Sequence, residues 1–374
     1  MPGASGAWWS QGRLCLIRTL QFCRWLRPRT SHDAWAAGLP PRRPRARRRC
    51  GALAALILLV AAQGGAAQEI RYIYDKLGRL VGVVDAQGRT AIYEYDPVGN
   101  LLAIRRQDAT GPVAITFVNP NQGTFGTRVE IFGIGFSPVA ANNQVSFNGV
   151  AAAVVSAANS NLTTSVPVGA TSGPITVTTP LGSATSPAPF TVLIRSDAAA
   201  DFSPSSNPNG AWSYGWSSTL GSAFNLDVAR ASVSGIDLWR GNLSGDGNPS
   251  VSHNGTTNVI SIGTVTWQPR QLAFHPGPSG EFSVIRWTAP TTATVSIAGS
   301  FTGTDCCATT TDVHVLRNGV SLFDNSVNGF GATVSFSATV SIQAGDTIDF
   351  IVGFGSDGNF FNDSTGLDAV ISGK

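Results

Sequence analysis

Residues 126–136 (GTRVEIFGIGF) constrain the fold of this chain more than any other stretch. Val129 and Ile131 alternate with other residues in the pattern of a β-strand that buries one face. Gly133 and Gly135 follow directly, and glycines inside a strand permit a bulge or a bend. The stretch therefore predicts a strand that bends near its end, within a β module at the centre of the chain.

Composition favours an all-β protein. The chain has 374 residues, enough for two or three domains, and it contains 42 Gly and 21 Pro. Only 13% of the residues are charged, and Thr, Ser, Val and Asn are frequent. After residue 68 no segment keeps a helical period, so we expect strands joined by many turns.

Two further segments extend the central strand into a sandwich: QVSFNG at 144–149 and GPITVTTPLG at 173–182. Together with 126–136 they resemble the IPT/TIG domain. The resemblance implies an immunoglobulin-like β-sandwich over 113–193, which serves either as a spacer or as a ligand-binding unit. DNA binding would need basic loops, and Arg128 is the only basic residue of this stretch, so we expect a spacer.

Charge is distributed unevenly along the chain. Residues 1–68 hold 11 Arg and one acid, whereas the remainder holds 14 Lys or Arg against 21 acids. The formal net charge of +3 therefore hides an acidic folded part without a basic stripe. This balance disfavours nucleic acid as a partner.

The basic excess belongs to a targeting segment. A basic run at 42–49 precedes an apolar run at 51–62 and the small residues of 65–67. This order is typical of a secretory signal peptide, here with a basic N-terminal extension, and predicts cleavage near Ala67. An uncleaved membrane anchor is the alternative, although the apolar run is short for a membrane span. We expect residues 1–68 to be removed and the mature chain, without a transmembrane span, to be secreted, periplasmic or extracellular.

Residues 69–108 contain an internal repeat. YIYD at 72–75 returns as YEYD at 93–96, an offset of 21 residues, and DAQGR at 85–89 forms another turn between them. The pattern resembles the RHS/YD repeat. Alternating aromatic residues, Asp side chains that close turns and Gly at positive φ predict a meander of hairpins that leans on the next domain. The alternative is a remnant without function, because repeat units gain stability from many stacked neighbours.

The C-terminal part predicts the largest domain. A polar linker is expected at 194–208 and a domain at 209–374, with strand patterns every 8 to 15 residues. About ten strands predict a two-sheet jelly-roll sandwich. HPGPSGEFSVIRWTAP and AGDTIDF are similar to a C-terminal domain of secreted bacterial proteins, which itself resembles carbohydrate-binding jelly rolls.

Trp212, Tyr214 and Trp216 lie at period two, so a strand places all three rings on one face. An exposed row of rings would stack on sugar rings, which makes these residues the candidate ligand-binding site. The alternative is that the rings fill the core of the sandwich, where aromatic side chains contribute much of the buried area. The same two alternatives apply to Trp239, Trp267 and Trp287, and we expect these residues in the core.

Oxygen-bearing side chains crowd the loop 355–366. Asp357, Asn359 and Asp363 have the ligand chemistry of a structural Ca²⁺ site, although their spacing is not that of an EF-hand. The alternative is that Asp and Asn stabilise local turns through their side chains.

Signals for catalysis are weak. The chain has no GxSxG, no HExxH and no Gly-rich phosphate loop. Asp312 and His314 lie two apart on one strand face, which we interpret as a structural hydrogen bond. Cys306 and Cys307 are adjacent, and a strained disulfide between them, reduced thiols or pairing with another chain all stay open.

The sequence thus predicts a non-catalytic, secreted or cell-surface binding protein. An Ig-like spacer would present a jelly-roll domain to a glycan or another extracellular ligand. A structural or adhesion protein that assembles through its β modules is the second hypothesis, and a glycan-active hydrolase is the third. A pair of carboxylates about 5 to 10 Å apart in a cleft would favour the hydrolase.

Overall fold

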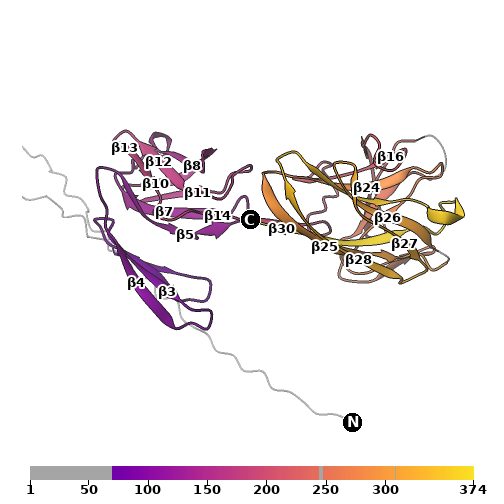
Figure 1. The fold of residues 1–374 in the computed structure, drawn as a ribbon, viewed down its shortest axis with the longest axis horizontal. Coiled ribbons are helices and arrows are strands. Elements are labelled where there is room, and N and C mark those ends of the chain that lie inside the picture. Colours follow the sequence, from indigo (N-terminus) through magenta and orange to yellow (C-terminus); the bar gives the residue numbers. More distant parts are fainter. Residues whose placement is uncertain (1–69, 244–246, 308) are drawn as a thin grey trace, which may run out of the picture. The chain divides into compact units, whose positions relative to one another are not determined.

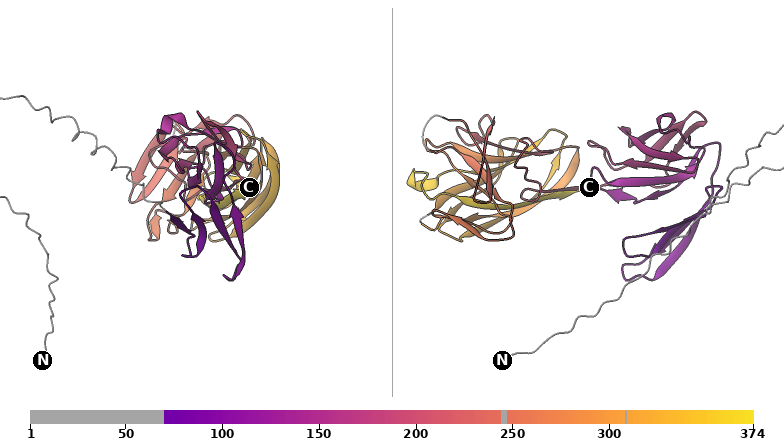
Figure 2. Two further views of the ribbon diagram at one scale, coloured as in Figure 1. Left: turned by 90° about the vertical axis from the view of Figure 1, so that its left-hand side faces the viewer. Right: turned by 180° about the vertical axis from the view of Figure 1, so that it is seen from behind.

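The computed structural model describes residues 70–243, 247–307 and 309–374. The signal peptide predicted for residues 1–68 lies outside the described residues. All views of the described residues show strands joined by loops (Figures 1 and 2). The only helical segments among these residues are two 3-10 turns, η1 (Ala140–Asn142) and η2 (Gly355–Asp357). No helix among these residues is long and apolar enough to cross a membrane. The predicted all-β class is confirmed.

The first four strands form a sheet of their own, the YD sheet. They are β1 (Arg71–Tyr74), β2 (Leu80–Val84), β3 (Thr90–Tyr95) and β4 (Leu101–Gln107). They pair antiparallel in chain order, so the sheet is the predicted meander. Strands β1 and β4 are its two outer strands.

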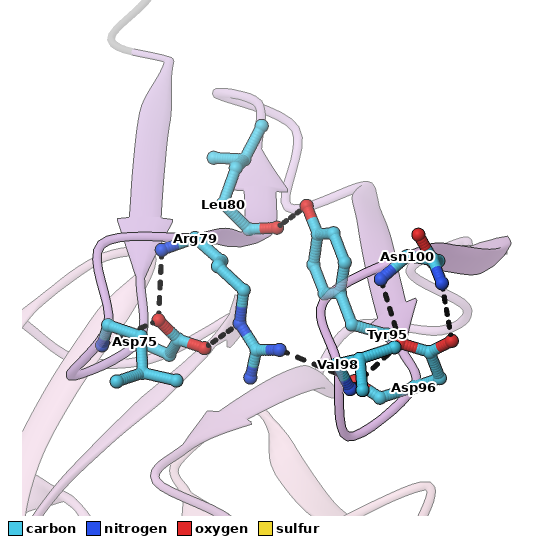
Figure 3. Close-up of polar contacts among 8 residues, drawn as sticks. Asp75, Arg79, Leu80, Tyr95, Asp96, Val98 and Asn100 are labelled. Carbon is cyan, nitrogen blue, oxygen red and sulfur yellow. Dashed lines mark hydrogen bonds and ion pairs between the residues drawn. The ribbon is translucent and has the colours of Figure 1, made fainter.

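Three turns of one design join these strands, and Figure 3 shows the first and the third. In each turn Oδ1 of an Asp accepts the backbone N–H groups of the residues two and four positions later, at 2.8 to 3.1 Å. Oδ2 accepts a bond from the side chain four positions later, which is Arg79 on Asp75, Arg89 on Asp85 and Asn100 on Asp96. The third residue after each Asp is a glycine at positive φ (+78°, +74° and +101°). The turn at Asp85 therefore repeats the chemistry of the two YxYD turns.

One face of the YD sheet packs on the following domain. Ile73 and Val84 are buried in a cluster with Phe132, and Phe117 packs against it. A Cβ added at Gly82 would approach the ring of Phe117 to 2.9 Å, so this close approach requires glycine. A small meander alone is marginally stable in water, and this contact supplies the apolar support that it needs.

Residues 114–192 form a β-sandwich, which we call the Ig-like sandwich. One sheet has the order β10-β11-β7-β5, the other has the order β13-β12-β8-β9, and β14 pairs with β6. The strands are β5 (Ala114–Asn119), β6 (Gln122–Gly123), β7 (Arg128–Ile134), β8 (Gln144–Phe147), β9 (Val150–Ala152), β10 (Val154–Ala158), β11 (Asn161–Ser165), β12 (Ile175–Thr179), β13 (Gly182–Thr185) and β14 (Thr191–Val192). Apolar residues from both sheets share one core.

The central strand β7 matches its prediction. Val129 and Ile131 are fully buried. A Cβ at Gly133 would overlap the carbonyl oxygen of Ala114, and Gly135 has φ +75°. The bulge itself lies in the partner strand β5, where the register shifts between Ile115 and Phe117.

The C-terminal sandwich is built from two large sheets. One runs β18-β19-β20-β23-β30-β25-β28 with β15 also paired to β30, the other runs β17-β16-β24-β29-β26-β27, and β21 and β22 form a separate hairpin. The strands are β15 (Ile194–Asp197), β16 (Trp212–Ser217), β17 (Asn225–Leu226), β18 (Ala229–Val233), β19 (Ile236–Arg240), β20 (Ser250–Asn254), β21 (Ile260–Ile262), β22 (Val265–Trp267), β23 (Leu272–His275), β24 (Phe282–Thr288), β25 (Ala293–Gly303), β26 (Thr310–Arg317), β27 (Val320–Asn328), β28 (Thr333–Ile342), β29 (Thr347–Val352) and β30 (Thr365–Gly373). One large cluster of buried apolar residues draws on both sheets. The two-sheet architecture predicted from the strand pattern is therefore present.

The expected linker 194–208 begins inside this sandwich. Its first residues form β15, which pairs antiparallel with the last strand, and Ile194 and Ala198 belong to the core. The small and polar residues of this segment suggested a linker. Its apolar residues pack on the large sheet, so its first part belongs to the sandwich.

Candidate functional site

The predicted aromatic platform on β16 is wrong for two of its three residues. Trp212 and Tyr214 are 1% and 0% exposed and lie in the main core of the C-terminal sandwich. The indole N–H of Trp212 donates to Asp201 Oδ2 at 3.2 Å. Trp216, at the end of the same strand, is partly buried. The face of β16 that carries the rings is turned toward the opposite sheet, so the rings fill the core, which was the alternative.

The other three tryptophans named above are also core residues. Trp239, Trp267 and Trp287 are at most 9% exposed. Each indole N–H has an acceptor, namely the backbone oxygen of Ser203, Oγ of Ser252 and Oγ of Ser196. Buried tryptophans with satisfied N–H groups are typical of structural positions.

The loop predicted to bind Ca²⁺ forms local turns instead. Both carboxylate oxygens of Asp357 accept bonds from Asn359, whose side-chain oxygen accepts the backbone N–H of Phe361. Asp363 is fully buried, and its Oδ1 accepts the backbone N–H of Thr310. Among the described residues no group of three or more His, Cys, Asp or Glu side chains is placed to hold a metal ion. The contacts of Asp357 and Asn359 are those of Asx turns, the alternative stated above.

The Asp312–His314 pair is part of a longer chain of hydrogen bonds. His314 places one ring nitrogen 2.9 Å from Asp312 and the other 2.6 Å from Asp324, and Ser321 donates to the second oxygen of Asp324. The hydroxyl of Ser321 therefore bonds a carboxylate rather than the imidazole. A nucleophilic serine needs the imidazole as its base, so Ser321 and His314 do not form a serine–histidine pair of that kind.

The strand register of the YD sheet reveals an aromatic face that the sequence analysis did not single out. Residues paired across neighbouring strands point to the same face. Tyr72 pairs with Val83, Val83 with Ala91 and Ala91 with Arg106, while Tyr93 pairs with Ile104. Tyr74 and Tyr95 follow at period two on their own strands. We call the side of the sheet with Tyr72, Tyr74, Tyr93, Tyr95 and Ile104 the tyrosine face.

The outer strands of this face are exposed, whereas Tyr93 and Tyr95 on β3 are partly buried. Tyr72, Tyr74 and Ile104 are 59%, 56% and 52% exposed, whereas Ile73, between the two tyrosines, is 8% exposed. The alternation arises because Ile73 packs on the Ig-like sandwich and its two neighbours must then point away from it. The Tyr-x-Tyr pattern of each repeat predicts that the tyrosines share one face. To predict that this face is exposed, one must also know which face of the sheet packs on the Ig-like sandwich.

Polar contacts hold one ring of this face in place (Figure 3). The hydroxyl of Tyr95 donates to the carbonyl oxygen of Leu80 at 2.8 Å. The guanidinium of Arg79 lies 5.1 Å from the centre of the Tyr95 ring, and its Nε donates to Asp75 at 2.7 Å. A cation at this distance attracts the ring face. The first turn of the repeat thus orients a tyrosine of the second.

A cavity lies beside the sheet. It has a volume of about 940 Å³, and Tyr74, Tyr93 and Phe117 are among the residues that line it. A second cavity, of about 670 Å³, is lined by Ile92, Glu94 and Arg105 on the face toward the Ig-like sandwich. An ion pair of 2.6 Å joins Glu94 to Arg105 there. Cavities of this size are typical of small-molecule sites.

Comparisons with known proteins each match only part of the chain or nothing. No curated protein matches it. Among solved structures it is similar to an auxiliary nutrient-binding protein from Bacteroides thetaiotaomicron (14% identity, TM-score 0.24, 47% of each chain covered). It is also similar to a CBM51 module from Clostridium perfringens in complex with methyl-galactose (15% identity, TM-score 0.22, 32% of this chain and 86% of that chain). A third is a family 35 carbohydrate-binding module from Clostridium thermocellum (9% identity, TM-score 0.20, 30% and 85%).

The first of these structures is matched over about half of its own length. TM-scores this low transfer neither a ligand nor an activity to this chain. One protein-family model also matches: the RHS repeat model fits residues 74–113, the segment that forms most of the YD sheet.

Proposed function

We propose that this protein is a non-catalytic, secreted or cell-surface binding protein whose glycan ligand stacks on the tyrosine face of the YD sheet. The observation that carries the proposal is the set of tyrosines at period two on one sheet face, where Tyr72 and Tyr74 are exposed and Tyr93 and Tyr95 are partly buried. Flat aromatic rings on a strand offer a platform for sugar rings. Period-two aromatic rings also occur on β16, but there Trp212 and Tyr214 are buried and offer no platform.

In this proposal the Ig-like sandwich is an IPT/TIG-type support at 113–193, and the jelly roll at 209–374 is a second module of the same surface protein. One feature favours the tyrosine face as the site. Tyr95 is already fixed by Leu80 and Arg79, so binding would cost little ordering of this side chain.

A glycan array with the full chain tests this function. We expect binding to one glycan class and a loss of at least about tenfold in affinity for Tyr72→Ala with Tyr74→Ala, since stacking on an aromatic ring contributes about 1 kcal/mol or more per ring. Phe330→Ala is the matched control, because Phe330 is as exposed as Tyr74, at 56%, but lies in the C-terminal sandwich. Unchanged binding by the double tyrosine variant would reject the tyrosine face as the site. No binding across a broad array would reject the proposal that the ligand is a glycan.

A specific observation also favours assembly as a second function. β4 is an outer strand of the YD sheet, and Leu101, Leu102 and Ile104 on it are 49%, 68% and 52% exposed. An exposed apolar edge strand is a template for pairing with another chain. Light scattering on the full chain would detect a dimer, and Ala103→Pro should abolish it, because proline removes a backbone donor in the middle of β4. A monomer at all concentrations would remove this candidate.

A further inference from the structure

Two adjacent thiols stand at the surface of the C-terminal sandwich. Cys306 and Cys307 are both exposed, and both are free. They lie in the loop between β25, which ends at Gly303, and β26, which begins at Thr310. Because the two residues are consecutive, the neighbouring Cys307 thiol also raises the pKa of the Cys306 thiol.

The loop is anchored immediately before the thiols. Asp305 is 1% exposed, and its two carboxylate oxygens accept bonds of 2.6 Å from Thr264 Oγ1 and from the backbone N–H of Ser364. The backbone N–H of Cys306 donates to the carbonyl oxygen of Thr264 at 2.9 Å. The thiols are therefore presented to solvent from a backbone that three hydrogen bonds, to Thr264 and Ser364, hold in place.

We propose that Cys306 and Cys307 form a redox-active dithiol that closes into a disulfide between neighbouring residues by exchange with a small-molecule disulfide, such as glutathione disulfide. One thiolate attacks the small disulfide, forms a mixed disulfide and releases one glutathione. The second thiolate attacks the protein sulfur of that mixed disulfide and releases the second glutathione. The protein pair loses two protons and two electrons, and the two electrons reduce the small disulfide to two thiols.

The adjacent position of the second thiol favours rapid closure, and strain makes the closed disulfide easy to open. The resolving thiol is the next residue, so it competes with solvent glutathione at a high effective concentration. The Cα atoms of neighbouring residues joined by a trans peptide are about 3.8 Å apart, below the usual range for disulfides of about 4.4 to 6.8 Å. A strained and exposed disulfide is more readily reduced than a structural one. The pair is thus suited to reversible oxidation rather than to permanent cross-linking, and this does not depend on the glycan proposal.

Peptide mapping of the full chain tests the inference. Trypsin cleaves after Arg286 and Arg317, with no Lys or Arg between them, so one peptide carries both thiols and no other cysteine. After treatment with glutathione disulfide and blocking of free thiols, we expect this peptide two hydrogens lighter than the reduced form and without blocking groups. Excess reduced glutathione should reopen it and restore two sites for the blocking reagent.

Single variants give the control. Cys306→Ser and Cys307→Ser each lack the resolving thiol, so each should keep one glutathione on the remaining cysteine. Three outcomes would overturn the inference: two glutathiones retained on the native peptide, a peptide cross-linked to a second copy, or two unreacted thiols. A closed disulfide that excess reduced glutathione leaves intact would also overturn it.

Discussion

Nδ1 of His314 lies 2.6 Å from Oδ1 of Asp324, across the antiparallel pair β26–β27. The other ring nitrogen faces Asp312 on the same strand as His314. Burial alone would lower the pKa of His314, but its hydrogen bonds with Asp312 and Asp324 raise it above the ordinary value of 6.5. The imidazolium thus joins a carboxylate on β26 to one on the outer strand β27 of the six-stranded sheet.

This arrangement predicts a loss of stability at alkaline pH. Because the pKa of His314 is raised in the folded state, its contribution is fully present below about pH 6.5 and is lost as the pH rises through the folded-state pKa. We expect a loss of about 1 to 2 kcal/mol from this group in urea unfolding between about pH 6 and about pH 9. His314→Gln should remove this part of the pH dependence. Equal slopes for the two proteins would contradict the prediction.

Asp227 predicts a second pH effect. It is 1% exposed, and neither carboxylate oxygen has a hydrogen-bond partner among the described residues. Burial raises its pKa to about 8. The native state therefore keeps the proton that the unfolded state releases, and stability falls as the pH rises from about 4 to about 8. Asp227→Asn should stabilise the fold at pH 8 by a few kcal/mol and have little effect near pH 4. Asp368→Asn, at an exposed position on β30, is the control and should change neither value.

Two turn glycines should respond differently to the same substitution. Gly78 and Gly88 both have positive φ, +78° and +74°, so alanine costs about 1 kcal/mol of backbone strain at either position. A Cβ at Gly78 meets no atom within 4 Å, whereas at Gly88 it would overlap Ile134 and lie 3.0 Å from the carbonyl oxygen of Gly133. Gly88→Ala should therefore destabilise the chain by clearly more than Gly78→Ala in denaturant unfolding. Equal losses would show that the YD sheet moves away from the Ig-like sandwich at little cost.

The ion pair of Arg286 and Asp349 should be costly to break on one side but cheap to replace by two apolar residues. Two parallel bonds of 2.7 and 2.8 Å join them across β24 and β29, Asp349 is 3% exposed, and the guanidinium lies 4.4 Å from the Phe224 ring centre. Arg286→Met leaves a buried carboxylate without its partner and should cost about 3 to 5 kcal/mol. Arg286→Met combined with Asp349→Leu should recover most of this loss. If the double variant is as unstable as the single one, an uncompensated charge is not the cause.

Calcium should have no effect on stability. Asp357 and Asn359 use their side chains in local turns, and Asp363 is buried with one oxygen bonded to Thr310. We expect the same Tm in millimolar Ca²⁺ and in chelator, measured at one ionic strength. A Tm that rises with Ca²⁺ and returns with chelator would restore the calcium site predicted from the sequence.

Local chemistry explains what could be predicted. The Asp-x-x-Gly turns and the strand at 128–134 each depend on residues close in sequence, so their patterns identify them. Local patterns identify the strands β20 and β23 less well. β20 reads SVSHN and β23 has four residues, and both are held by neighbours on either side within the eight-stranded sheet. A short or polar segment becomes a strand when a sheet offers it backbone partners on both edges.

By itself, the sequence determined that aromatic residues alternate on strands, because side chains on a strand always point to opposite faces. It did so equally for Trp212 and Tyr214 on β16 and for Tyr72 and Tyr74 on β1. Only the tertiary structure decided which row is covered: β16 faces the opposite sheet of its sandwich, whereas on β1 it is Ile73 that faces a neighbouring domain. Whether a face is buried depends on what packs against it from distant parts of the chain, and period two carries no information about that.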